Sequence, residues 1–130
     1  MNPKQLHFDS DGREKLLSGI TQIAKAVKST LGPRGNTVLI ESQEHTHGIT
    51  VTKDGVTVAK SIFLLDAVEN LAVRIMKEAA DKTATSAGDG TTTAIVLTEA
   101  LVNEGIVEIG DGVNRTEVLK VLQQECEVII

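Results

Sequence analysis

Apolar side chains recur every three or four residues in four stretches of the chain, the spacing that places them on one face of an α-helix. Three of the stretches cover residues 11–31, 65–84 and 91–106, and a fourth begins near 114–116 and continues to the last residue of the sequence. We therefore expect four long helices. The last of them has no capping or helix-breaking residue at its end, as if the sequence stopped within an element.

A β-hairpin is predicted between the first two helices. Residues 37–41 and 49–52 are rich in β-branched side chains, and the polar stretch 42–48 separates them. A third, short extended run is expected at 56–59. The predicted fold is therefore mainly α, with four helices packed together and a small hairpin at the edge.

Composition and charge narrow the function classes. The net charge of -5 is spread over interspersed acidic and basic residues, so no basic face stands out that could neutralise a nucleic-acid backbone. Phe8 and Phe63 are the only aromatic residues, which removes the stacking surfaces of single-strand binders. No stretch approaches the ~20 apolar residues that span a bilayer. The single cysteine, Cys126, cannot form an internal disulfide, so we expect a reducing compartment, the cytoplasm.

The sequence Gly-Asp-Gly-Thr-Thr-Thr at 88–93 directly precedes the third helix and has the features of a phosphate site. Glycines let the backbone approach a ligand closely, and the free N–H groups and dipole of a helix N-terminus attract anions. A phosphate would repel Asp89 unless a cation lay between them, which makes Asp89 a candidate Mg²⁺ ligand. The alternative is that Asp89 is a turn residue and one of the threonines an N-cap. The motif is not a Walker loop, because the Gly-Lys-Ser/Thr ending is absent.

Two further segments have a similar character. Residues 30–35 form the glycine-bracketed sequence Thr-Leu-Gly-Pro-Arg-Gly, and residues 53–55 join a lysine, an aspartate and a glycine. Each alone is typical of an ordinary helix stop or turn. Three such loops in one small domain favour convergence on one ligand, although spacing alone does not establish it.

The motifs at 30–35, 52–59 and 87–94 resemble, in order and in spacing, the N-terminal nucleotide-binding motifs of group I chaperonins, the GroEL-like protein-folding machines. The similarity extends over nearly the whole chain and includes a helix start at 66–70 and a turn at 110–114. It implies that residues 1–130 are the N-terminal segment of an ATP-binding equatorial domain. The domain would be an incomplete helical bundle, with the intermediate and apical domains absent.

The resemblance also implies roles for individual residues. Those expected to bind the phosphates of ATP are Thr30, Leu31, Gly32, Pro33, Lys53, Gly55, Gly90, Thr91, Thr92 and Thr93. Asp89 would hold Mg²⁺, and Asp54 matches a catalytic carboxylate implicated in positioning the attacking water or in hydrolysis itself. In the family, a K⁺ ion also sits near the residues that match Thr30, Lys53 and Thr92.

The function implied is that of an ATP-dependent protein-folding subunit of a homo-oligomeric double ring. In the family the hairpin, with a short strand matching residues 6–8, pairs with a neighbouring subunit. Unfolded proteins and a co-chaperonin would bind through the absent domains. The second catalytic aspartate and the residues that hold the base and ribose also lie in the missing part. The chain by itself is therefore expected to lack a complete ATPase site.

Two other readings remain open at this point. A short chaperonin-like chain could act as an interaction module that joins a host ring without ATP turnover, or the chain could be an independent small phosphate-binding protein. His45 and His47 could ligate a metal, but no third ligand is in sight. Asn36 and Thr37 replace the basic residue and the asparagine that are more usual in the family. The glycosylation pattern at 114–116 is more simply a helix cap.

Overall fold

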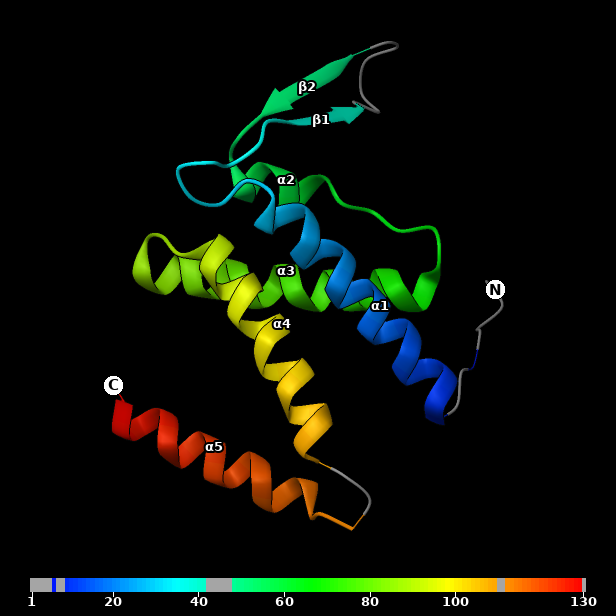
Figure 1. The fold of residues 1–130 in the computed structure, drawn as a ribbon, viewed down its shortest axis with the longest axis vertical. Coiled ribbons are helices and arrows are strands. Elements are labelled where there is room, and N and C mark those ends of the chain that lie inside the picture. Colours follow the sequence, from blue (N-terminus) through cyan, green and yellow to red (C-terminus); the bar gives the residue numbers. More distant parts are fainter. Residues whose placement is uncertain (1–5, 7–8, 42–47, 110–111, 130) are drawn as a thin grey trace. The chain divides into compact units, whose positions relative to one another are not determined.

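The computed structural model describes residues 6, 9–41, 48–109 and 112–129, which form five helices and one two-stranded hairpin (Figure 1). In chain order the elements are α1 (Asp9–Lys28), β1 (Val38–Glu41), β2 (Ile49–Thr52), α2 (Gly55–Ser61), α3 (Ala67–Ala87), α4 (Thr91–Glu108) and α5 (Arg115–Ile129). The mainly α fold with a small hairpin is confirmed. The four long helices begin and end within a few residues of the predicted bounds.

The prediction of an extended run at 56–59 was wrong, because these residues belong to the short helix α2. The carboxylate of Asp54 accepts hydrogen bonds from the main-chain N–H groups of Val56 and Thr57, and so supplies an N-cap. The helix then buries Val58 and Ala59. Capping and burial together outweigh the preference of β-branched side chains for strands, which is a weak determinant in itself.

The hairpin pairs β1 with β2 in antiparallel register, from Val38 opposite Thr52 to Glu41 opposite Ile49. Its apolar residues Leu39, Ile49 and Val51 are exposed. The proposed histidine pair at 45 and 47 lies outside the described residues, as does most of the N-terminal stretch at 6–8 for which a strand was expected.

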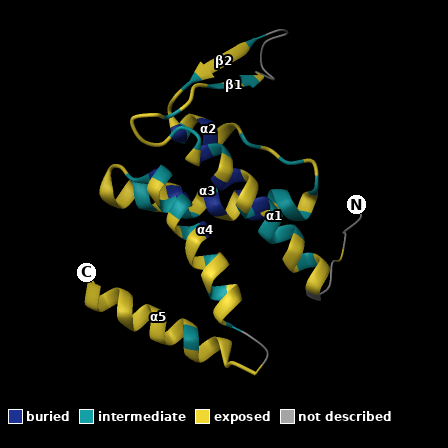
Figure 2. Ribbon diagram, viewed as in Figure 1, coloured by how far each residue is buried: buried dark blue, intermediate teal, exposed yellow. Residues whose placement is uncertain are grey.

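The core forms where α1 lies against α3 (Figures 1 and 2). The two helices cross so closely that a Cβ atom at Gly19 would lie 2.3 Å from the main-chain oxygen of Glu69. Among the described residues, no aromatic side chain belongs to this core. Its buried members are Ile23, Ala24, Val27, Ala59, Val73, Met76, Ala80 and Ile95.

Side chains fix the start of α3 against α1. Asp66 caps α3 by accepting from the N–H of Val68 at 2.8 Å, and its other oxygen accepts from the ammonium of Lys15 at 2.7 Å. The bond from Lys15, followed by the main-chain bonds, lowers the pKa of Asp66 to about 2. The capping carboxylate is therefore ionised at neutral pH, and the two helices are held in one register.

Residues 1–99 and 100–130 form two compact units, and α4 runs from the first into the second. The helix α5 of the second unit has no buried residue. Packing of the fourth predicted helix with the others therefore stays a prediction. None of the described helices combines the length and the apolar character that crossing a membrane requires.

Candidate functional site

The three loops singled out in the sequence meet at Gly55. A Cβ atom at this position would lie 2.5 Å from the Thr92 hydroxyl oxygen and 3.0 Å from the Thr30 hydroxyl oxygen. Real Cβ atoms do not approach other atoms so closely, so only glycine fits here without a shift of its neighbours. Gly55 itself is buried. The first residue of α2 is therefore packed between the loop that follows α1 and the N-terminus of α4.

The first loop turns tightly as α1 ends. Gly32 adopts a positive φ of 76°, and the N–H of Gly35 donates to its main-chain oxygen at 3.0 Å. The N–H of Asn36 then donates to the oxygen of Ser29 at 2.7 Å, which closes the loop at its base. A side chain at Gly35 would meet the main-chain oxygen of Thr30 at 2.3 Å. These bonds give residues 30–35 a defined shape in which residues 31–34 are exposed.

The second loop presents Lys53 and Asp54, both exposed. The Asp54 carboxylate accepts from the Thr57 hydroxyl at 2.5 Å and from the Thr57 N–H at 3.0 Å. The hydroxyl bond, followed by that N–H, lowers the pKa of Asp54. Asp54 is therefore held as an anion, a form suited to orienting a water molecule.

The third loop connects α3 to α4 through Gly88 and Gly90, whose φ angles are 77° and 93°. The main-chain oxygen of Gly90 accepts from the N–H of Ala94 at 2.8 Å, so Gly90 occupies the N-cap position of α4. The alternative of a threonine N-cap is therefore not what the structure shows. The first N–H groups of a helix have no partner within it, so the start of α4 is suited to binding an anion.

The three threonines at the start of α4 differ in exposure. Thr91 is buried, Thr92 is half-buried, and Thr93 is exposed. Thr91 shares its buried helix face with Ile95 and Glu99. Residues 91–99 of α4 belong to the first unit, and there the hydroxyl of Thr92 lies next to Gly55.

Asp89 has the environment of a carboxylate that can share a metal ion with a ligand. It is exposed, and one oxygen accepts from the N–H of Gly90 at 2.6 Å. No cluster of three or more acidic, histidine or cysteine side chains forms among residues 6, 9–41, 48–109 and 112–129. A metal here would therefore take most of its ligands from phosphate and water. Mg²⁺ binds in this way, so the residues present fit it.

The structure brings together some of the residues predicted to bind ATP and Mg²⁺, and leaves others apart. Thr30, Gly55 and Thr92 lie in contact. Lys53 and Asp89 make no hydrogen bond or ion pair with the other two loops within the described ranges. Their approach to a common ligand remains a prediction.

One ion pair, between α1 and α4, was not predicted from the sequence. Lys28, in the last turn of α1, bonds to the carboxylate of Glu99, which is only 7% exposed. A buried carboxylate is costly unless it is paired, so this contact fixes the end of α1 to α4. The signal in the sequence was slight: Glu99 lies four residues after Ile95, on the apolar stripe.

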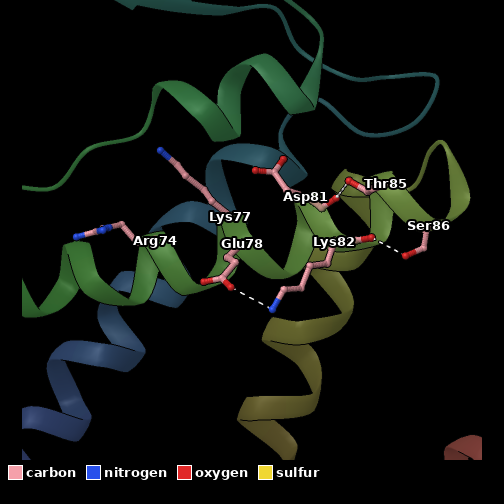
Figure 3. Close-up of a pocket in the computed structure, with 7 residues that line it drawn as sticks. All are labelled: Arg74, Lys77, Glu78, Asp81, Lys82, Thr85 and Ser86. Atoms are coloured by element: carbon pink, nitrogen blue, oxygen red, sulfur yellow. Dashed lines mark hydrogen bonds and ion pairs between the residues drawn. The ribbon is translucent and has the colours of Figure 1, made fainter.

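A groove of about 720 Å³ runs along α3 and contains none of the loop residues (Figure 3). Its lining mixes cations with carboxylates and hydroxyls, and consists of Arg74, Lys77, Glu78, Asp81, Lys82, Thr85 and Ser86. The mixture of charges favours no single class of ligand.

Comparison with known proteins gives a consistent result. The model of the TCP-1/cpn60 chaperonin family matches residues 23–130. Among solved structures, the chain is similar to the chaperonin gp146 from the bacteriophage EL 2 (Pseudomonas aeruginosa), crystallised in the presence of ATP-BeFx in two forms. In crystal form II the identity is 39% and the TM-score 0.70, over 78% of this chain and 18% of that one. In crystal form I the values are 41% and 0.64, over 72% and 16%. The chain thus spans less than a fifth of the length of these structures.

Proposed function

Because this chain belongs to the TCP-1/cpn60 chaperonin family, we propose that it binds the phosphates of ATP, with Mg²⁺, at the junction of residues 30–33, 53–55 and 89–93. The observation that carries this proposal is the packing of Gly55 against the hydroxyls of Thr30 and Thr92. Loops that are far apart in the sequence and suited to phosphate binding are thereby joined at one point. The related gp146 structures, solved in the presence of ATP-BeFx, support the choice of ligand.

In this proposal, main-chain groups, a lysine and an aspartate each contribute to binding the phosphates and the metal. The main chain of residues 30–33 and the first N–H groups of α4 surround the phosphate oxygens, while the ammonium of Lys53 adds positive charge. Asp89 holds Mg²⁺, which neutralises phosphate charge when bound. A K⁺ ion near Thr30, Lys53 and Thr92 is part of the same proposal.

Asp54 has the role of orienting water in ATP hydrolysis. Its carboxylate already accepts from Thr57, which fixes its direction and keeps it ionised. Phosphoryl transfer depends mainly on positioning and electrostatic stabilisation, so an oriented anion can contribute without removing a proton itself. Turnover further requires groups that hold the base and ribose, and none of the three loops supplies these.

At the scale of an assembly, the proposed role is that of a subunit in an oligomeric, ATP-dependent protein-folding ring in the cytoplasm. The exposed apolar residues of the hairpin, Leu39, Ile49 and Val51, support contact with a neighbouring subunit, because an apolar strand edge favours pairing. The same surface favours a second candidate function, an interaction module that joins a ring without ATP turnover. Unfolded proteins and a co-chaperonin as partners belong to the first proposal only.

The test is calorimetric titration of the chain with ATP, with Mg²⁺ and with excess chelator. We expect binding to be tighter with Mg²⁺, and Asp89→Asn to lose this gain, roughly tenfold or more in affinity, because the metal loses its protein ligand. The matched control is Glu104→Gln, which removes an exposed carboxylate from α4 outside the three loops. In a complete subunit, Asp89→Asn should also suppress Mg²⁺-dependent hydrolysis. An equal Mg²⁺ effect in wild type and Asp89→Asn would remove Asp89 from the site.

A further inference from the structure

The short helix α2 is held at both ends by side chains. It has only seven residues, and a helix of this length is not stable by itself. At its N-terminus, Asp54 accepts from the N–H groups of Val56 and Thr57. Burial of Val58 and Ala59 holds its middle, so its position along its own axis depends further on what holds the other end.

The other end is held by Lys77 of α3. The Lys77 ammonium donates to the main-chain oxygen of Ile62 at 2.6 Å and to that of Lys60 at 2.9 Å. Figure 3 shows this side chain pointing away from α3. The last carbonyl groups of a helix lack partners within it and form the negative end of its dipole, so a cation is the group best suited to bind them. Partial burial lowers the pKa of Lys77, as expected for an ammonium held against protein instead of water.

The arrangement of the three loops depends on the position of α2, because its first residue, Gly55, is packed tightly between two of them. Gly55 fills the gap between Thr30 and Thr92, where even a Cβ atom would lie 2.5 Å from a hydroxyl oxygen. Movement of α2 along its axis therefore either separates Gly55 from the two hydroxyls or forces them apart. It also carries Asp54, which is bonded to the first turn of the helix, out of its place.

We propose that Lys77 is a positioning residue: by binding the C-terminal carbonyls of α2 it sets the place of Gly55 and Asp54 relative to Thr30 and Thr92. Lys77 lines the groove along α3, and within the described part of the chain its ammonium bonds to the C-terminal end of α2 and to none of the three loops. Its effect on the loops would therefore pass through α2. The inference rests on the proposed function, since it concerns the geometry of the same phosphate site.

The test compares Lys77→Met with Lys82→Met in the chain. Both variants remove one ammonium from α3 and keep an unbranched stem, but the ion pair that Lys82 forms in the described part of the chain is with Glu78 of its own helix, at 3.0 Å. Amide hydrogen exchange of α2 is measured first. We expect Lys77→Met to speed exchange in α2 by about tenfold or more, because bonds to a charged donor are lost there. Exchange in the centre of α1 should not change. Lys82→Met should leave α2 as in the wild type, and Lys77→Arg should restore much of the protection.

Titration with Mg²⁺-ATP is the second readout. We expect affinity to fall by about tenfold in Lys77→Met, since a displacement of about 1 Å is enough to disrupt an oriented site. It should stay unchanged in Lys82→Met. Circular dichroism establishes that the variants fold. If Lys77→Met does not, Lys77→Gln, which retains a donor for one carbonyl, should give an intermediate loss of protection and affinity.

The outcomes separate the claims. Equal exchange in α2 for Lys77→Met and Lys82→Met would overturn the inference. So would loosening of α2 with wild-type affinity for Mg²⁺-ATP, which would leave Lys77 a purely structural role. Failure of the wild-type chain to bind Mg²⁺-ATP at all would contradict the proposed function, and the positioning role with it. The exchange measurement would then still show whether Lys77 holds α2.

Discussion

Gly55 is the residue at which the arrangement of the loops is most sensitive to change. Thr30 and Thr92 belong to segments separated by α2, α3 and the hairpin, yet both hydroxyls lie against this one Cα. The absence of a side chain allows the approach, since the backbone of α2 can then pack directly on α4. The contact therefore links the identity of one amino acid to the shape of a whole site.

Replacing Gly55 with alanine should spread the loops. The added Cβ would overlap the Thr92 hydroxyl, and forcing atoms into a well-packed region costs about 1–3 kcal/mol. We expect thermal stability to fall and Mg²⁺-ATP affinity to drop by about tenfold. Calorimetry measures the affinity, with Gly105→Ala as control, because nothing lies within 4 Å of a Cβ at Gly105. Wild-type affinity in Gly55→Ala would show that the contact does not shape the site.

Turns were predictable from the sequence because their motifs are local, whereas contacts that join distant segments had no local signal. The turns at 88–90 and the loop at 30–35 were identified because glycine and proline restrict or free the backbone at their own positions. The pair of Lys28 with Glu99 joins residues 71 positions apart, and the spacing of Glu99 from Ile95 does not identify its partner. The role of Asp54 as a cap depended on α2, which the sequence did not predict.

Among the elements, the crossing of α1 over α3 depends on Gly19, which is buried where the two helices are closest. The long helices α1, α3 and α5 were predictable because each has an apolar stripe over several turns, and α4 because apolar residues recur along its length. The short helix was not, since seven residues make only two turns and their β-branched side chains favour a strand. Its helical form results from the Asp54 cap and from burial of Val58 and Ala59.

Gly19→Ala should destabilise the first unit. The new Cβ would lie 2.3 Å from a main-chain oxygen of Glu69, so α1 and α3 would have to separate, at a cost of about 1–3 kcal/mol in the free energy of unfolding. Urea denaturation followed by circular dichroism measures this change. Gly105→Ala in α4 is the matched control and should stabilise by about 0.5–1 kcal/mol, since alanine favours helices and meets no neighbour there. Equal effects of the two substitutions would contradict the close crossing.

For the molecule as a whole, the predicted fold class is confirmed, because the apolar residues recur regularly along the chain. The same pattern does not predict how the two units pack. All three loops belong to residues 1–99, one compact unit, so the proposed phosphate site does not depend on where residues 100–130 lie. Outside that unit, α5 buries no residue and exposes Leu119, Leu122 and Val128.

The central claim is that residues 30–33, 53–55 and 89–93 form one site for Mg²⁺-ATP. The most direct measurement is ¹⁵N–¹H NMR of the labelled chain during titration with Mg²⁺-ATP, which reports each amide separately. We predict that the largest shift changes fall on Gly32, Gly55 and residues 90–93 together, with one common dissociation constant. Changes confined to the charged groove of α3, or no localised change at saturating nucleotide, would contradict the account.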